Sequence, residues 1–460
     1  MTVTPAQNGI FDDVGQRILR LRTSDAALAR LPLLCLLLAS LFSGLAALAS
    51  ARKLSIDVES VATAEAMLRT WLGEPRQPAP LSTNSAPGYP LLLAILSRLV
   101  PGLRDGLACA AERLGPCSLA SLIPLLLLQV AAAIATLALA YRLARTLSNQ
   151  TSVALLTVIL MYFATRPGSF AGMVRGQTWL VLLLFLHVVM LSDTIQRGAR
   201  LPAVTSGCAL AGATLFEPLA VVMIPISALL LALTPSARTG GAVPDRPAPL
   251  IFLTTAIPAL AALISLAVSL SYDGETLGRN IGLGVVQRLA FVGLKASTAL
   301  ATIATSIPLF GDMIATLLPV SEVRLISPGG VEGSLVHDAV AHRWPNALAR
   351  SGNASWGAIA TMLRETLLTS PLGYTLSLAP VWARGLFAGG GVIALLGLFH
   401  LRPMLAYARA DARRPLHRLV FIPVLAMLAI NVLVTGNPFW SNPLLPFVYA
   451  YAIAYVAAGW

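Results

Sequence analysis

The chain of 460 residues is far too apolar for a soluble domain: 57% of its residues are hydrophobic and 11% are charged, against about 25% charged in soluble domains. The net charge of +12 comes mostly from arginines in short segments between apolar runs, as in the cytoplasmic loops of membrane proteins. A nucleic-acid partner is therefore not expected, and four cysteines in so long a chain exclude a disulfide scaffold. The sequence predicts an all-α polytopic membrane protein.

The amino-terminal part of the chain predicts a cytoplasmic segment and a first membrane span. Residues 1–30 carry four arginines, and the apolar run 31–50 follows them. About 20 apolar residues suffice to cross a bilayer, whereas the apolar core of a signal peptide is shorter. We therefore interpret 31–50 as an uncleaved helix whose amino terminus lies in the cytoplasm.

A helix at the membrane interface is predicted after the first span. From Val58 to Trp71 the apolar residues recur mostly at spacings of three and four, which indicates an interfacial helix with Trp71 as its anchor. Glu65 and Arg69 have the spacing of an i,i+4 ion pair on the polar side of that helix.

A proline-rich stretch separates this helix from a second one. Its five prolines predict irregular backbone up to Leu91. The run Leu91–Val100 is too short to cross a bilayer, so we expect a helix that leans on the outer face. Cys109 and Cys117 follow, and they can form a disulfide in an oxidising compartment or remain free thiols.

Further spans are defined by apolar runs between short basic segments. A hairpin of two of them is broken at Glu217-Pro218, and an arginine-rich cytoplasmic loop is predicted at 401–418. The predicted spans after the first are 118–141, 153–164, 179–191, 203–216, 219–233, 250–272, 386–400, 419–434 and 444–460.

These elements divide the chain into four parts. The cytoplasmic segment is followed by a transmembrane core, 31–272, which includes the outer loop 51–117. An outer region, 273–384, contains an apolar tract at 289–318 that we interpret as a re-entrant or interfacial hairpin. The last part, 385–460, holds the carboxy-terminal transmembrane helices.

Two carboxylates, Asp57 and Glu59, stand just beyond the first span, where a charge near lipid is costly unless it serves a function. They share a face only if the backbone is extended, since on a helix they would diverge by about 200°. We therefore expect a non-helical turn at Asp57. The alternative is that Asp57 caps a helix beginning at Val58, with Glu59 stabilised by the helix dipole.

Several features in this order resemble the GT-C glycosyltransferases, polytopic enzymes that take sugars from polyprenyl-phosphate or polyprenyl-diphosphate carriers. The features are Asp57-Val58-Glu59 after the first span, Ala-Pro-Gly-Tyr-Pro-Leu-Leu-Leu at 86–93, a span ending in Leu-Ala-Arg at 143–145, and a break at Pro218. The resemblance covers most of 30–235 and, more loosely, the last three spans. Similar members are the dolichyl-phosphate-mannose protein mannosyltransferases and the aminoarabinose transferases.

The resemblance implies a GT-C-like bundle of about ten transmembrane helices with interfacial helices in the first outer loop. It implies an inverting glycosyltransferase, in which Asp57 is the general base and Glu59 joins a metal or phosphate network. The implied donor is a polyprenyl-phosphate-linked sugar, and the acceptor is a lipid, glycan or protein. No cofactor is certain, and a divalent cation, Mg²⁺ or Mn²⁺, is the one candidate. Membrane lipids are the remaining partners.

We expect a multi-pass protein of the bacterial inner (plasma) membrane. The arginine distribution puts the loop with Asp57 on the periplasmic or exterior side. We expect the active site on that side.

Four other residues are candidates for substrate binding, each with a structural alternative. Arg175 and Arg384 would bind the donor phosphate, or lipid headgroups at the interface. Tyr89 would contact the sugar, or belong to the aromatic belt of the membrane. Glu217 would be a second carboxylate of the site, or cap the next helix.

Two other functions stay open. A transporter or lipid flippase would place charges along a path between two related halves, and we find no internal repeat. An inactive relative with a transferase fold is favoured by one departure from the family: the turn 166–179 holds no second carboxylate.

Overall fold

The protein is seen in a computed structural model. It describes residues 33–34, 37–42, 55–56, 58–73, 87–112, 119–165, 173–174, 176–233, 247–292, 294–307, 339–387, 391–410, 414–430 and 444–459. Helices dominate these residues, and the exception is a single pair of two-residue strands. The prediction of an all-α fold is confirmed in this form. The predicted first span falls largely outside the described residues.

In the amino-terminal half, three short helices, α2 to α4, come before the longer apolar ones. They are β1 (Ser55–Ile56), α2 (Val58–Leu72), α3 (Gly88–Leu99), α4 (Leu103–Glu112), α5 (Leu119–Ser148), α6 (Thr151–Thr165), β2 (Met173–Val174), α8 (Gln177–Arg197), α9 (Arg200–Phe216), the 3-10 helix η2 (Pro218–Val222) and α10 (Met223–Leu233).

The carboxy-terminal half begins with the longest helix and ends with three helices of 15 to 20 residues. Its elements are α11 (Pro247–Leu289), α12 (Ala296–Ser306), the π-helix η3 (Ala339–Arg343), α16 (Trp344–Arg350), α17 (Ser355–Thr369), α18 (Pro371–Leu376), α19 (Leu378–Phe387), α20 (Gly391–Ala410), α21 (Arg414–Ile430) and α22 (Leu445–Gly459).

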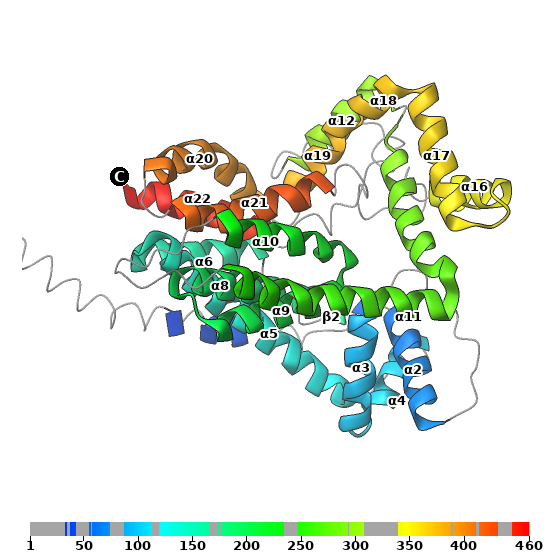
Figure 1. The fold of residues 1–460 in the computed structure, drawn as a ribbon, viewed down its shortest axis with the longest axis horizontal. Coiled ribbons are helices and arrows are strands. Elements are labelled where there is room, and N and C mark those ends of the chain that lie inside the picture. Colours follow the sequence, from blue (N-terminus) through cyan, green and yellow to red (C-terminus); the bar gives the residue numbers. More distant parts are fainter. Residues whose placement is uncertain are drawn as a thin grey trace, which may run out of the picture.

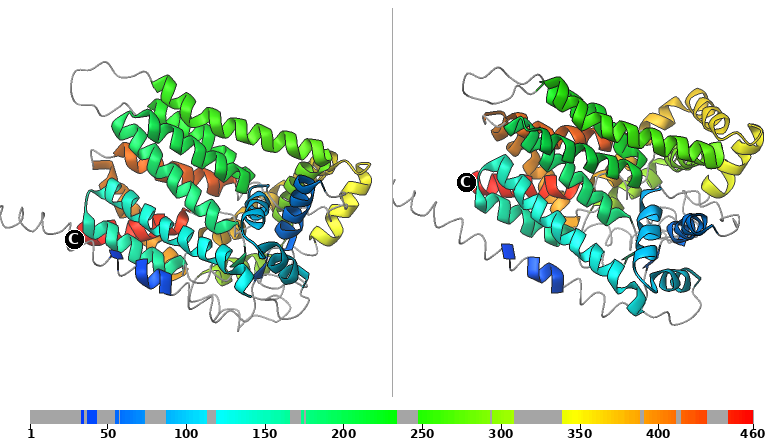
Figure 2. Two further views of the ribbon diagram at one scale, coloured as in Figure 1. Left: turned by 90° about the horizontal axis from the view of Figure 1, so that it is seen from below. Right: turned by 60° about the horizontal axis from the view of Figure 1, so that its bottom comes forward.

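The long apolar helices lie side by side in a bundle (Figure 1). Helix α8 packs between α5 and α9, α9 packs on α11, and α22 packs between α6 and α20. The short helices α2, α3 and α4 lie across one end of the bundle, and the carboxyl terminus lies at the opposite end (Figure 2). This crosswise arrangement agrees with the predicted interfacial position of α2 and α3.

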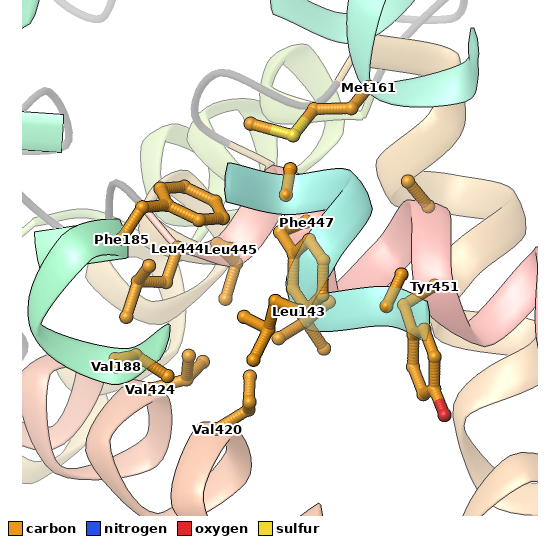
Figure 3. Packing of buried hydrophobic residues seen from close by; sticks show 14 of the residues in the cluster. Leu143, Met161, Phe185, Val188, Val420, Val424, Leu444, Leu445, Phe447 and Tyr451 are labelled. Atoms are coloured by element: carbon orange, nitrogen blue, oxygen red, sulfur yellow. The ribbon is translucent and has the colours of Figure 1, made fainter. Parts of the chain in front are cut away.

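The main hydrophobic core lies where α5, α6, α8, α21 and α22 meet (Figure 3). Phe447 of α22 is fully buried and packs edge-to-face on Phe185 of α8, with ring centroids 5.6 Å apart. On its other side it stacks on Tyr451, at 5.8 Å between centroids. Aromatic pairs of this kind add specific geometry to the packing of apolar helices.

Two described helices are long and apolar enough to cross a membrane, at Ser121–Ser148 and Gln177–Arg197. A third span results if the bent pair Pro371–Phe387 and Val392–Ala406, which meets at 105°, is counted as one. Five shorter apolar helices accompany them in the described part of the chain. These helices identify a membrane protein, while the number of about ten spans stays a prediction.

The prediction of irregular backbone up to Leu91 is wrong, because α3 begins at Gly88. Pro90 lies in the first turn of this helix, where a proline is tolerated since its missing N–H would have no partner within the helix. The Pro87 carbonyl accepts a hydrogen bond from the Leu91 N–H at 2.9 Å. The last proline of the proline-rich stretch therefore lies in the first turn of α3.

Two predicted helix ends in the second half are also wrong. Most of the predicted loop at 401–418 is helical, since α20 ends at Ala410 and α21 begins at Arg414. Leucine, alanine, methionine and arginine are strong helix formers, so the helices continue after the hydrophobic stretch ends. The predicted span at 250–272 is part of the 43-residue α11, and the predicted domain boundary after 272 therefore falls inside a helix.

A buried polar network ties three bundle helices together. His187 of α8 is fully buried. Its Nδ1 lies 3.0 Å from the Ser206 carbonyl oxygen on α9, and its Nε2 lies 3.0 Å from the Ser227 hydroxyl on α10. The Ser206 carbonyl can only accept, so Nδ1 carries the proton and donates to it. Nε2 therefore accepts a hydrogen bond from the Ser227 hydroxyl. Polar side chains between apolar helices are expected to be paired in this way.

Ser227→Ala should lower the stability of the bundle, because it leaves the buried His187 Nε2 without its donor. An unsatisfied buried polar atom costs about 1–3 kcal/mol. Thermal unfolding in detergent measures the loss. Thr205→Ala is the control, since that hydroxyl bonds only to its own helix, at Leu201. Equal unfolding temperatures for both variants would contradict the role of the network.

Candidate active site

A short parallel strand pair joins two segments that are far apart in the sequence. Ser55 pairs with Met173, and Ile56 pairs with Val174. These strands follow the first predicted span and the end of α6, respectively. In the sequence, Asp57 follows Ile56 and Arg175 follows Val174. The pairing therefore ends one residue before each of these two candidates.

Tyr89 lies where the ends of three helices meet. It is 4% exposed, and its ring centroid is 6.4 Å from that of Phe216 at the end of α9. Gln129 Nε2 of α5 donates a hydrogen bond to the Tyr89 hydroxyl at 3.1 Å. A buried tyrosine with a bonded hydroxyl does not belong to an exposed aromatic belt. Its proposed contact with the sugar stays a prediction.

Two glycines allow this close approach. A Cβ on Gly88 would lie 2.7 Å from the backbone carbon of Leu215, and a Cβ on Gly176 would lie 3.0 Å from Tyr89 Cβ. Gly88 therefore brings α3 onto the end of α9, and Gly176 brings the start of α8 onto Tyr89. We call the region formed by residues 55–56, 88–90, 173–174, 176–177 and 215–217 the junction.

Glu217 belongs to the junction through its backbone. Helix α9 ends at Phe216, and the extended Glu217 donates its N–H to the Ala213 carbonyl at 2.8 Å. The Glu217 carbonyl accepts from the Ala220 N–H at 2.9 Å, which starts η2. The predicted break at Glu217-Pro218 is thus confirmed. The half-buried Glu217 stands next to Phe216 and therefore close to Tyr89.

The other predicted residues are described in part or not at all. Asp57 and Arg175 lie outside the described residues. Glu59 lies in the first turn of α2 and Arg384 lies in α19, but their side chains are not described. The main contacts of α19 are with α12, α20, α18 and α21, and none of these helices belongs to the junction. Tyr89 and Glu217 therefore belong to the junction, whereas Arg384 lies on a helix outside it.

An ion cluster holds the outer helices in position. Glu65 of α2 pairs with Arg69 on the same helix at 2.9 Å and with Arg104 of α4 at 2.5 Å. The predicted i,i+4 pair is confirmed. The hydrogen bond from Arg104, and then that from Arg69, lower the pKa of Glu65 against the opposing effect of its partial burial. The carboxylate therefore fixes α4 against α2.

Several residues of this region could not be predicted from the sequence. Gln129 and Gly176 fix the position of Tyr89, yet a glutamine and a glycine near apolar runs carry no specific signal. Arg104 is 39 residues from Glu65, so no helical spacing could reveal the pair. Cys109 is disulfide-bonded, whereas Cys117, its predicted partner, lies outside the described residues.

The described residues contain no group of three or more His, Cys, Asp or Glu side chains that could hold a metal ion. Asp57 is not among these residues, and the Glu59 side chain is not described either. A divalent ion on these two carboxylates therefore stays a prediction.

Two solved structures of the oligosaccharyltransferase from Archaeoglobus fulgidus are similar to this chain, with TM-scores of 0.48 and 0.46 and 12% and 11% sequence identity. One is the apo form, and the other is a complex with an inhibitory peptide and a dolichol-phosphate. Each match covers 94% of this chain and 50% of the other, so the chain spans about half the length of that enzyme. No protein-family model and no curated protein matches the chain.

Gly88→Ala should disrupt the junction more than Gly176→Ala. The new Cβ at Gly88 meets the Leu215 backbone, which cannot rotate away, whereas the Cβ at Gly176 meets side-chain atoms of Tyr89. Overpacking costs about 1–3 kcal/mol, and we expect Gly88→Ala at the upper end. Thermal unfolding in detergent provides the measurement. Gly357→Ala is the control, because its Cβ would meet only atoms of Ser351 and Ala354, at 3.2–3.9 Å, and it should be neutral or stabilising. An equal loss in all three variants would argue against the junction.

Acid should loosen the outer helices. Because the pKa of Glu65 is lowered in the folded protein, its contribution is present above the pKa of the unfolded chain and is lost as the pH falls through the folded value. The wild type should therefore lose more stability below pH 4.5, the ordinary pKa of this group, than Glu65→Gln does. Unfolding temperatures from pH 7 to pH 3 test this, and parallel curves for the two proteins would refute it.

Proposed function

We propose that this chain is an integral-membrane glycosyltransferase that moves a sugar from a polyprenyl-phosphate carrier to an acceptor at the outer face of the membrane. The main support for this proposal is the β1–β2 pair, which ends one residue before Asp57 and one residue before Arg175. Transfer from a phosphate needs a base for the acceptor hydroxyl and a cation for the leaving phosphate. The two segments supply one of each.

Chain connectivity limits how far apart these two residues can lie. Consecutive Cα atoms are about 3.8 Å apart, and neighbouring strands are about 4.8 Å apart. Starting from the paired Ile56 and Val174, the Cα atoms of the next residues are therefore within about 12 Å of each other. An aspartate and an arginine side chain can reach a common substrate across that distance, which supports the assignment.

In the proposed reaction, Asp57 accepts the proton of the acceptor hydroxyl. The acceptor oxygen forms a bond to the anomeric carbon while the bond from that carbon to the phosphate oxygen breaks. The electron pair leaves with the polyprenyl phosphate, whose charge Arg175 stabilises. Attack opposite to the leaving group inverts the anomeric centre.

Other candidates have supporting roles in this proposal. Glu59, two residues after Asp57, would hold the phosphate network or a divalent ion such as Mg²⁺ or Mn²⁺, which would neutralise phosphate charge. Glu217 follows Phe216 and Arg175 precedes Gly176, and both of these neighbours contact Tyr89. Tyr89 therefore lies beside the sequence neighbours of two candidate residues, Glu217 and Arg175. Arg384 would contact the donor phosphate if α19 lies on the side of the substrate opposite the junction.

The localisation follows from the same proposal. Helices α2, α3 and α4 lie crosswise at the junction end of the bundle, as interfacial helices would. With the amino terminus in the cytoplasm, this end faces the periplasm or exterior of a bacterial inner membrane. A lipid-linked donor could then approach the junction from the bilayer, and a lipid, glycan or protein acceptor from the outside.

Asp57→Asn should abolish transfer while the protein stays folded and inserted. Loss of a general base removes roughly 10²–10⁴-fold of the rate. If Asp57 only capped α2, which begins at Val58, Asn would serve about as well. A membrane-fraction assay with a panel of radiolabelled polyprenyl-phosphate sugars distinguishes the two roles, and Glu59→Gln with added chelator tests for a metal.

Asp105→Asn is the matched control, because Asp105 is an exposed carboxylate on the neighbouring α4. It should transfer sugar at the wild-type rate. Near-normal turnover by Asp57→Asn would exclude the catalytic assignment. No transfer by the wild type with any donor of the panel would instead favour an inactive relative.

A further inference from the structure

An arm made of short helices extends from the end of α11. It consists of α16, α17, α18 and α19, and we call it the arm. Its core is separate from that of the bundle, and is formed by the end of α11 with residues of α16 and α17, including Val286, Trp344, Ala347, Ala358 and Met362. Because the arm packs around its own core, its exposed side chains form a defined surface.

Helix α17 is apolar on two opposite faces. Ser355, Ala358, Ile359 and Met362 are buried in the arm. The opposite face exposes Trp356, Leu367 and Leu368, which are 51%, 49% and 71% exposed, and Arg364 lies among them. With 3.6 residues per turn, these four residues fall within a sector of about 120°. A helix facing water would carry polar side chains there.

The apolar surface continues onto the next two helices. No residue of α18 is buried, and its leucines Leu372 and Leu376 are 70% and 65% exposed. Trp382 of α19 is 50% exposed. Three consecutive helices thus expose large apolar side chains, with a tryptophan in the first and another in the last. Tryptophan is enriched where protein meets the boundary between water and lipid.

The arm also carries a net positive charge. The arm, residues 344–387, contains three arginines and one acidic residue, Glu365, and Glu365 is paired with Arg350 at 2.8 Å. Arg364 is exposed between Trp356 and Leu368. An arginine in an apolar surface can bury its stem and extend its guanidinium to the headgroups. Net positive charge beside apolar residues is complementary to an anionic lipid surface.

The position of the arm agrees with such a surface. The arm lies at the same end of the bundle as α2 and α3, and α17 runs crosswise to the long helices (Figure 1). Both views of Figure 2 show the arm and α2 at that end. Helix α11 continues from the apolar stretch Ala248–Ile264 to Leu289 without a break. The arm is therefore attached, through its packing on α11, to a helix that contains an apolar stretch.

We propose that the exposed face formed by Trp356, Arg364, Leu367, Leu368, Leu372 and Leu376 docks into the headgroup region of the adjacent leaflet and prefers anionic lipids. The leucines and Trp356 enter the boundary of the acyl chains, and Arg364 binds lipid phosphate. A protein partner is less suited to this face, because the rim of a protein interface is polar and this face offers one charged group. The proposal does not depend on the glycosyltransferase activity.

Spin labelling of the full-length protein in vesicles tests this proposal. A nitroxide is placed on Leu368→Cys, with Cys35 and Cys208 replaced by alanine. Its exposure is measured by power saturation with oxygen, which enters lipid, and with a nickel chelate, which stays in water. The matched control is Asn346→Cys on α16, which is exposed and polar. We expect the label at Leu368 to be accessible to oxygen and shielded from the chelate, and the label at Asn346 to show the reverse.

Each other outcome overturns part or all of the proposal. Equal access of the chelate to both labels would show that the face lies in water. Shielding of the Leu368 label from both reagents would show a contact with protein, such as a second copy. For lipid charge, the label should lie deeper in vesicles with phosphatidylglycerol than in pure phosphatidylcholine, and Arg364→Gln should remove this difference. The same depth in both vesicles would refute the preference for anionic lipids.

Discussion

The close approach of three helix ends around Tyr89 is the constraint on which the candidate site depends. Gly88 lets the start of α3 touch the backbone at Leu215, and Gly176 lets the start of α8 touch Tyr89. The strand β2 ends two residues before Gly176 and holds β1 by backbone hydrogen bonds. A side chain in place of either glycine would separate these helices and change the distance between the two paired segments. Packing in the junction therefore controls the position of the segments that lead to Asp57 and Arg175.

Most of the fold could be predicted because apolar runs of membrane length are a strong signal. The helix of the outer loop, the break at Glu217-Pro218 and the Glu65–Arg69 pair depend on local spacing, and all three are confirmed. The predicted ends failed where hydrophobicity and helix propensity differ. Helix α5 continues past Tyr141 to Ser148, since its last turns contain good helix formers although they leave the apolar stretch.

The candidate site could be predicted less completely, because it is assembled from contacts between distant segments. The order of motifs selected Tyr89 and Glu217, and the structure brings their surroundings together. Strands of two residues have no alternating pattern, so the pairing of Ile56 with Val174 could not be foreseen. Gln129 was missed for a similar reason, since its hydrogen bond to Tyr89 crosses 40 residues.

The arm is tied to α11 at α18 and to the bundle at its carboxyl end. At α11, the buried Arg288 donates to the Ser377 hydroxyl at 2.8 Å and lies over the Tyr374 ring at 4.5 Å. Burial lowers the pKa of Arg288, and these contacts offset part of that desolvation. At the carboxyl end of the arm, the Tyr449 hydroxyl of α22 donates to the Leu386 carbonyl of α19 at 2.7 Å. Because α18 and the end of α19 are both fixed, a lipid contact on α17 and α18 would also set the position of α19, the helix that carries Arg384.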